Sequence, residues 1–117
     1  MTYSDYEYEI FSRQFILKVF SEQNIEKLEK SKVSIIGIGG IGCPLATYLV
    51  SSGIKYIQLI DGDIIEKSNL NRQILFTSDD IGQKKVAIAK QKLLKINPNC
   101  KIKIIDINLN KSNTINL

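Results

Sequence analysis

Hydrophobic residues in this chain fall into short continuous runs and into helical repeats, and the two kinds of segment alternate. Apolar runs at 33–36, 56–60 and 101–106 predict strands, the first two buried on both faces of a sheet. Between the runs, apolar residues recur at helical spacing in 41–49 and in 82–97, which predicts helices. Strand, helix, strand, helix, strand is the order typical of a parallel sheet with right-handed crossovers. The fold class expected is therefore α/β, with a Rossmann-like parallel sheet of three strands.

The residues that flank the predicted helices indicate where each one begins and ends. Gly53 follows the first helix and is a typical terminator. Asp79 and Asp80 precede the second helix as candidate caps, and Pro98 stops it. The apolar positions expected to face the sheet are Ile41, Leu45, Ala46 and Leu49 in the first helix and Val86, Ala89, Leu93 and Ile96 in the second.

Residues 1–31 lack the strand pattern and predict a helical arm ahead of the sheet. Helical spacing extends from about Asp5 to Ser31. The residues expected on its apolar side are Phe11, Phe15, Ile16 and Val19, followed by Ile25 and Leu28 in a second short segment. This divides the chain into an arm, 1–31, and an α/β domain, 32–117, whose polar last stretch, 108–117, is expected to fray.

Length and composition suit one soluble domain. The chain has 117 residues and no apolar run near the ~20 residues that span a bilayer, so no membrane segment is expected. Its start, MTYSDYEYEI, carries acids and tyrosines where a secretory signal would be basic and then apolar, which indicates a reducing compartment such as the cytoplasm. A bias towards isoleucine, lysine and asparagine is typical of an AT-rich genome and adds a plastid stroma as an alternative. Cys43 and Cys100, with no histidine in the chain, support neither a zinc site nor a disulfide framework.

The positive charge of the chain bears on the partners that it can have. The net charge of +4 comes mostly from lysines between Lys84 and Lys111. Such an excess usually marks a solvated helix face, and the basic residues lack interleaved aromatics, so no nucleic-acid partner is expected. An anionic nucleotide or an acidic protein partner fits the same charge.

Glycines follow the first predicted strand at the spacing of a phosphate-binding loop. The segment 37–42 reads G-I-G-G-I-G, in which Gly37, Gly39 and Gly42 fit G-x-G-x-x-G and Gly40 lies between them. At such a turn, small residues let the backbone approach phosphate oxygens at the positive end of a helix. The same glycines also suit a tight strand-to-helix turn without a ligand. The motif alone predicts a nucleotide and leaves NAD and ATP open.

Two carboxylates follow the second predicted strand. Asp61 ends that strand about twenty residues after the glycines, the position from which an acid accepts hydrogen bonds from ribose hydroxyls. Asp63 stands shortly after it and suits either the ribose or an ordinary acid-rich turn. This pattern strengthens the prediction of nucleotide binding.

A polar string directly after these acids separates ATP from NAD, because a dehydrogenase has no need of it there. Residues 61–76 read D-G-D-I-I-E-x-S-N-L-N-R-Q-I-L-F, and D-I-G-x-x-K follows at 80–85. Together with the glycine loop, this sequence closely resembles the family that includes MoeB, ThiF and the adenylation domains of ubiquitin-activating enzymes. The likeness runs from about Phe11 to Pro98. The segment Ser12-Arg13-Gln14 is similar to the S-R-Q that opens the bacterial sulfur-carrier activators.

The resemblance implies an ATP-dependent adenylyltransferase that activates the C-terminal carboxylate of a small ubiquitin-like sulfur-carrier protein, in molybdopterin or thiamine biosynthesis. It also implies a homodimer that uses ATP and Mg²⁺. The nucleotide-binding residues implied are Gly37, Gly39, Gly40, Gly42, Asp61, Asp63, Ser68, Asn69, Leu70, Asn71, Arg72 and Lys85. The catalytic cations implied are Arg72, Lys85 and Arg13, the last reaching across the dimer into the neighbouring site.

Chemistry supports cations at such a site, because the reaction brings a carboxylate to a triphosphate and both are anions. The chain has only two arginines among its sixteen basic residues, which fits their use where planar recognition matters. From the residues alone, Arg72 and Lys85 also suit surface charges, and Arg13 suits an exposed pair with Glu7 or Glu9.

Members of this family are longer than 117 residues. The resemblance places the magnesium aspartate, the groove for the partner's tail and any zinc or catalytic cysteine in a second half without a counterpart here, so no metal ligand is expected. A sheet cut after its third strand would also expose the edge of its first strand. The chain is therefore expected to be an incomplete fragment that binds ATP weakly and does not turn over. An NAD-binding oxidoreductase fragment and a non-catalytic nucleotide-binding or dimerisation remnant are the alternatives.

Overall fold

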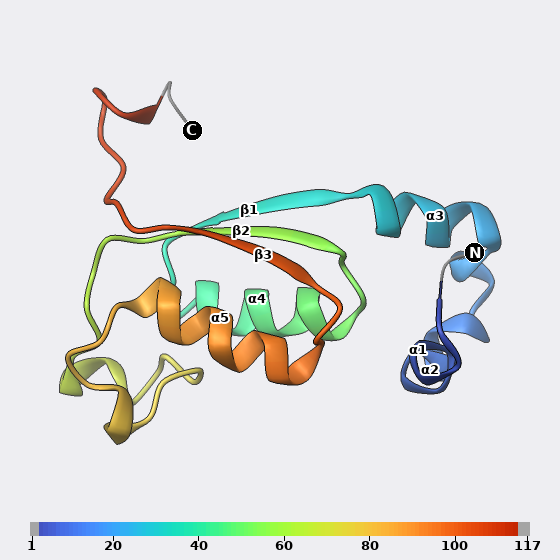
Figure 1. The fold of residues 1–117 in the computed structure, drawn as a ribbon, viewed down its shortest axis with the longest axis horizontal. Helices are drawn as coiled ribbons and strands as arrows, with labels where there is room; N and C mark the ends of the chain where they lie inside the picture. The colour runs from blue at the N-terminus through green and yellow to red at the C-terminus, as the bar shows by residue number, and fades with distance from the viewer. Residues whose placement is uncertain (1–2, 115–117) are drawn as a thin grey trace.

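The computed structural model describes residues 3–114 as a helical arm followed by an α/β unit (Figure 1). The arm contains α1 (Asp5–Ile10), α2 (Ser12–Phe15), the 3₁₀ helix η1 (Lys18–Phe20) and α3 (Glu22–Lys30). The α/β unit contains β1 (Lys32–Ile36), α4 (Gly42–Ser51), β2 (Tyr56–Ile60), the 3₁₀ helices η2 (Lys67–Asn69) and η3 (Ser78–Asp80), α5 (Lys85–Ile96) and β3 (Lys101–Ile105). None of the helices described has the length and apolar content of a membrane span.

The strands form one open parallel sheet in the order β1-β2-β3. The register aligns Ile36 with Ile60 and Ile105 near the carboxyl ends of the strands. Both α4 and α5 lie on the same face of this sheet (Figure 1). The prediction of an α/β fold with a Rossmann-like, three-stranded parallel sheet is confirmed. Among the described residues the outer edge of β1 has no partner strand.

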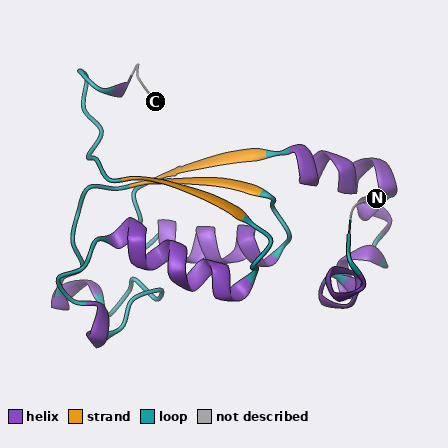
Figure 2. Ribbon diagram, viewed as in Figure 1, coloured by secondary structure: helices purple, strands orange, loops and turns teal. Residues whose placement is uncertain are grey.

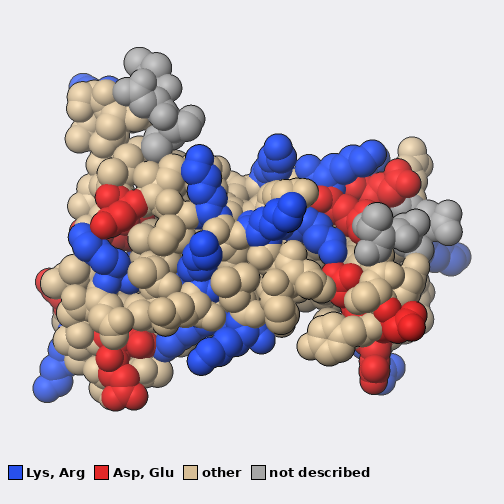
Figure 3. Space-filling view, in the orientation of Figure 1, with Lys and Arg blue, Asp and Glu red and all other residues tan. Residues whose placement is uncertain are grey.

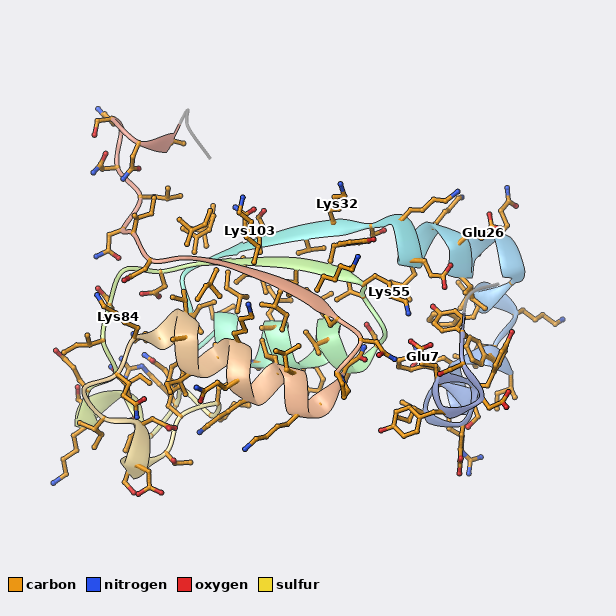
Figure 4. All side chains as sticks on the ribbon, viewed as in Figure 1. Glu7, Glu26, Lys32, Lys55, Lys84 and Lys103 are labelled. Atoms are coloured by element: carbon orange, nitrogen blue, oxygen red, sulfur yellow. The ribbon has the colours of Figure 1, made fainter. Side chains whose placement is uncertain are left out.

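The other face of the sheet carries no layer within residues 3–114 (Figure 2), which makes the expectation of a first strand buried on both faces wrong. In β1, Ile35 is buried on the helix side, whereas Ile36 is 64 % exposed. Lys32 and Lys103 point away from the helices on the open face (Figure 4). An apolar run predicts a strand, but it does not determine how many layers cover that strand.

The main core lies between the sheet and the two helices, and the rotation of α4 differs from the predicted one. The buried residues of α4 are Gly42, Cys43, Ala46 and Val50. Ile41 and Leu45, which were expected to face the sheet, are 83 % and 45 % exposed. The rotation is set where the helix begins, because Gly42 packs directly against the backbone of Gly37 and turns its own side of the helix inward.

The second crossover helix, α5, follows the predicted face but not the predicted caps. Its buried residues include Val86, Ala89 and Leu93, while Ile96 is 37 % exposed. Asp80 does not cap α5. It ends η3 instead, where its carboxylate accepts the Thr77 N–H at 2.8 Å and pairs with Lys92. Asp79 lies in the same 3₁₀ turn, so neither acid caps the helix that follows.

The arm is a series of short helices with its own apolar cluster, not one long helix. Phe11 interrupts the helical path with φ −95° and ψ 11°, and its ring is buried. The residues of this cluster are Tyr3, Phe11, Phe15, Phe20 and Ile25. Ile16 and Val19, expected on the apolar side, are 75 % and 64 % exposed. The break at Phe11 changes which residues turn inward, so a single helical repeat does not describe them.

Several contacts attach the arm to the loop between α4 and β2. Glu7 pairs with Lys55, with 2.7 Å between carboxylate oxygen and ammonium nitrogen (Figure 4). The ring of Phe11 lies against Gly53. This loop leads into the amino end of β2, so the arm lies at the opposite end of the sheet from the turn that follows β1 (Figure 1).

Replacing Lys55 with methionine should destabilise the chain by about 2 kcal/mol at pH 7, because Glu7 is buried and loses its charged partner. Burial alone raises the pKa of Glu7, but hydrogen bonds from Lys55 and Ser4 outweigh it and hold the pKa below its ordinary value. The pair therefore stabilises the fold above about pH 4.3, and this contribution is lost as the pH falls through the lower folded pKa. Urea unfolding of the unsubstituted chain and of Lys55→Met measures the difference in their free energies of unfolding. A difference at pH 3 as large as that at pH 7 would contradict this role.

Candidate functional site

The turn between β1 and α4 has a backbone path that requires glycine at two positions. Gly37 has a φ of +90°, in the left-handed region that glycine adopts without strain. At Gly42, a Cβ would stand 2.0 Å from the Gly37 carbonyl oxygen. The Gly37 N–H donates to the Ile60 carbonyl at 2.8 Å, which ties the turn to β2. These glycines are therefore explained by the fold alone.

Gly39 and Gly40 form the outer surface of the same turn, and no protein atom requires glycine at either position. A Cβ on Gly39 would stand 3.9 Å from the Gln73 side chain, and one on Gly40 would stand 3.5 Å from Arg72 Cγ. Both are ordinary contact distances. A groove between the edge of β1 and the start of α4 opens onto both glycines, and the helix N-terminus beside them attracts anions. The open backbone is therefore suited to the close approach of a phosphate chain.

Asp61, the predicted ribose ligand, lies at the carboxyl end of β2 and is 7 % exposed. One of its carboxylate oxygens accepts the Ile38 N–H and the other accepts the Asp63 N–H, both at 2.8 Å. These bonds hold the glycine turn against the loop that follows β2. Each oxygen has a second lone pair, so the carboxylate retains capacity for a ribose hydroxyl, and the ribose role stays a prediction.

The loop between β2 and α5 is a packed unit. Its apolar side chains Ile65, Leu75 and Phe76 belong to the main core. The Asn69 side chain is buried and accepts the Glu66 N–H at 2.8 Å, which closes η2. The other predicted nucleotide residues of this loop are Ser68 and Asn71, which are exposed, and Leu70, which is half-buried. The loop backbone that carries the polar residues is therefore anchored in the core.

Arg72 lies over the glycine turn. Its Cγ and Cδ are 3.5 and 3.6 Å from the position that a Cβ would take on Gly40. Its Nη1 donates to the Ser68 carbonyl and to the Asn71 side chain, each at 3.0 Å. These bonds orient the guanidinium, and within the described residues they engage Nη1 alone. The other N–H groups of this planar cation are thus placed beside the turn for the oxygens of an anion.

Lys85, at the start of α5, has a buried side chain. It is 6 % exposed, and no carboxylate of the described residues lies within 4.0 Å of its ammonium nitrogen. Its charge acts on Cys43, at the start of α4. Burial raises the pKa of the Cys43 thiol at the start of α4, and the charges of Lys85 and Asp61 act on that thiol in opposite directions. Lys85 is therefore a cation kept near the turn without an acidic partner.

Arg13 is not brought to this turn. It is exposed on α2, in the arm at the opposite end of the sheet (Figure 1). Neither Glu7 nor Glu9 forms an ion pair with it, and Glu7 pairs with Lys55 instead. A role for Arg13 in nucleotide binding therefore needs a second copy of the chain.

Asn108 contacts the site although the sequence analysis did not single it out. Its side chain accepts the Gly62 N–H at 3.0 Å and donates to Asp63 at 3.2 Å. A Cβ on Gly62 would stand 2.7 Å from the Asn108 nitrogen, so the chain passes very closely here. The expectation of a frayed stretch is wrong for Asn108, and 115–117 lie outside the described residues. In the sequence, the signal for this close approach of Asn108 was Gly62, which lies between Asp61 and Asp63 and has no side chain.

The described residues do not form a magnesium site by themselves. In 3–114, no group of three or more histidine, cysteine, aspartate or glutamate side chains could hold a metal ion. Both oxygens of Asp61 accept backbone N–H groups, and Asp63 is bonded to Asn108. Acidic side chains gather at the loop end and on the arm, with lysines between them (Figure 3). These residues therefore give no basis for a reaction step that involves the metal.

Sequence comparison relates this geometry to known proteins. The profile of the ThiF family matches residues 11–117. The chain is 44 % identical over 116 residues to the probable molybdopterin-synthase adenylyltransferase of Porphyra purpurea. The alignment covers 99 % of this chain and 30 % of that protein, so the chain spans less than a third of this relative.

Solved structures with the same fold hold adenine nucleotides. Escherichia coli MccB with ATP aligns with a TM-score of 0.74 and 43 % identity, over 78 % of this chain and 27 % of that chain. A crystal structure of MccB with AMPCPP and MccA aligns with a TM-score of 0.72 and 45 % identity, over 74 % of this chain and 26 % of that chain. E. coli TcdA, a tRNA N6-threonylcarbamoyladenosine dehydratase, in complex with AMP aligns with a TM-score of 0.87 and 28 % identity. This alignment covers 97 % of the present chain and 45 % of the TcdA chain.

Proposed function

Since the chain belongs to the ThiF family, we propose that it forms the nucleotide-binding part of an ATP-dependent adenylyltransferase that activates the C-terminal carboxylate of a small ubiquitin-like sulfur-carrier protein. The observation that carries the proposal is the position of Arg72 over Gly40, with the charge of Lys85 acting on Cys43 at the start of the helix that follows the turn. The N–H groups of Arg72 that the protein does not engage lie beside an open glycine backbone, an arrangement suited to the oxygens of a phosphate.

The proposed reaction joins two anions. A carboxylate oxygen of the carrier attacks the α-phosphorus of ATP, the new oxygen–phosphorus bond forms, and the bond from the α-phosphorus to its bridging oxygen breaks as pyrophosphate leaves. Donors fixed before the reaction stabilise this build-up of charge. The start of α4 and the free N–H groups of Arg72 hold the phosphates, Lys85 adds a point charge, and Asp61 orients the ribose.

The carrier is proposed from the comparisons. The Porphyra purpurea relative is named a molybdopterin-synthase adenylyltransferase, which favours the small subunit of that synthase as the carrier. The thiamine sulfur carrier offers the same carboxylate chemistry. MccB is crystallised with MccA, which supports a polypeptide as the second substrate of this fold.

The functional unit is proposed to be larger than 117 residues and dimeric. The chain spans 30 % of the Porphyra purpurea relative, and the edge of β1 is unpaired within the described residues. Further polypeptide is expected to cover that edge and to supply the magnesium ligand. Arg13 is expected to act on the glycine turn of a second protomer, because it lies far from its own.

Titration of the purified chain with ATP and with NAD tests the proposal. ATP should bind and NAD should not, and Arg72→Ala should weaken ATP binding about 100-fold because it removes the oriented cation over Gly40. Lys95→Ala, which changes an exposed lysine of α5, is the matched control and should bind ATP unchanged. No ATP–pyrophosphate exchange is expected from the isolated chain with a carrier protein. Preference for NAD, or unchanged ATP binding by Arg72→Ala, would overturn the proposal.

A further inference from the structure

Gln73 follows Arg72 in the loop between β2 and α5, and its side chain has an unusual environment. The residue is 4 % exposed. Its Oε1 accepts no hydrogen bond, and it is the only buried side-chain nitrogen or oxygen in that condition within the described part of the chain. Its backbone is fixed, because its N–H donates to the Asn69 carbonyl at 2.9 Å and its carbonyl accepts the Phe76 N–H at 3.1 Å. The amide is therefore held in place without protein partners for its oxygen.

Packing alone does not explain a glutamine at this position. A buried carbonyl group without a donor lowers stability, and an apolar side chain of similar length fills the same space without that penalty. Buried polar atoms in native proteins are paired almost without exception, so an orphan indicates a partner that arrives from outside the chain. The oxygen of Gln73 is therefore best explained by a ligand or by water that the ligand brings with it.

The position of the amide indicates which ligand this is. Gln73 Nε2 lies 3.9 Å from the place that a Cβ would take on Gly39, just as Arg72 lies over Gly40. The two consecutive side chains thus face the two glycines that the fold does not require. One offers a charged donor and the other a neutral donor and acceptor. Together they form a wall opposite the open backbone of the turn.

We propose that Gln73 binds the nucleotide: its Nε2 donates to a phosphate oxygen held on Gly39, and its Oε1 accepts a hydrogen bond from water that solvates the same phosphates. The proposal rests on the proposed ATP-binding function. It assigns the orphaned amide a role that exists only in the nucleotide complex. The free chain then carries an unsatisfied polar group that the bound chain does not.

This assignment predicts opposite effects on stability and on binding. Gln73→Met should raise the melting temperature of the free chain by about 4 °C, since it removes an unpaired buried polar group. The same variant should weaken ATP binding about tenfold, since it removes the donor to phosphate. Gln73→Glu should weaken binding further, because it places a carboxylate against the phosphates. The matched control is Gln91→Met, an exposed glutamine of α5, which should change neither quantity.

Thermal unfolding and ATP titration of these variants, measured beside Arg72→Ala, separate the outcomes. If Gln73→Met binds ATP unchanged while Arg72→Ala does not, the assignment of Gln73 is wrong and the proposed function stands. If the unsubstituted chain does not bind ATP at all, the proposed function itself fails. If Gln73→Met does not fold, NMR of the unsubstituted chain decides: the side-chain amide signal of Gln73 should shift on saturation with ATP, and a signal that stays in place overturns the assignment.

Discussion

A chain carrying Gly42→Ala is expected to be largely unfolded at 25 °C. Its new Cβ would stand 2.0 Å from the Gly37 carbonyl oxygen; the backbone fixes the position of a Cβ and the oxygen belongs to the backbone, so no side-chain rotation relieves the clash. The turn must open, and α4 must move away from its packing position against the sheet. We expect a loss of at least about 4 kcal/mol, a large part of the stability of a small domain. Circular dichroism and urea unfolding measure this loss directly.

Gly40→Ala is the matched substitution in the same turn, and it should fold. Its Cβ would meet only the stem of Arg72, at 3.5 Å, which is an ordinary contact. We expect a native spectrum and ATP binding that is weaker by about tenfold or more, because the methyl group occupies the surface that the phosphates approach. If Gly40→Ala bound ATP like the unsubstituted chain, the phosphates would not lie on this part of the turn. A native Gly42→Ala chain would instead show that the turn can be repacked.

The contrast between these glycines illustrates how far the sequence alone could predict the site. The spacing of 37–42 predicted a phosphate loop as a unit, but it could not separate the glycines that the backbone requires from those that a ligand requires. That distinction depends on the three-dimensional path of the turn and on side chains that other segments bring to the site. One of them is Gln73, whose importance rests on an unpaired oxygen and therefore on three-dimensional packing. The other is Asn108, which reaches Gly62 only because β3 pairs beside β2.

The fold could likewise be predicted only in part from the sequence. The order of strands and helices follows from the period of the apolar residues, and the parallel sheet follows from that order. The rotation of α4 did not follow, because apolar residues occur on several sides of this helix and periodicity cannot choose between them. The packing of Gly42 against Gly37 determines that the side of α4 that carries Cys43 is buried. Sequence periodicity thus predicts that a helix exists more reliably than it predicts which side is buried.

The apolar residues that the rotation of α4 leaves exposed to solvent explain why the chain suits a larger assembly. Ile41, Leu45 and Tyr48 are 83 %, 45 % and 74 % exposed on one side of α4, and Ile36 beside the β1 edge is 64 % exposed. Neighbouring apolar residues of this kind usually mark a surface that another segment or partner covers. The surface adjoins the groove at the glycine turn. Polypeptide that covers it would therefore also enclose the proposed nucleotide site and exclude water from the reaction.

Lys85→Met is expected to weaken ATP binding about 100-fold while the chain remains folded. The Lys85 side chain is buried and its ammonium nitrogen has no carboxylate partner among the described residues, so its removal leaves no acid unpaired and costs the free protein little. The phosphates, in contrast, lose a cation from a poorly solvated site, where charge interactions are strong.

The neighbouring lysine provides the control for this prediction. Lys84 (Figure 4) is exposed. It pairs with Asp106 at 3.2 Å at the protein surface, where an ion pair contributes little. Lys84→Met should therefore bind ATP within about twofold of the unsubstituted chain. Both variants lose the same charge at adjacent positions, so a non-specific effect of net charge on ATP binding would weaken both equally. Titration of each with ATP at low and high salt distinguishes the cases, because equal losses that disappear together in salt would place Lys85 outside the nucleotide site.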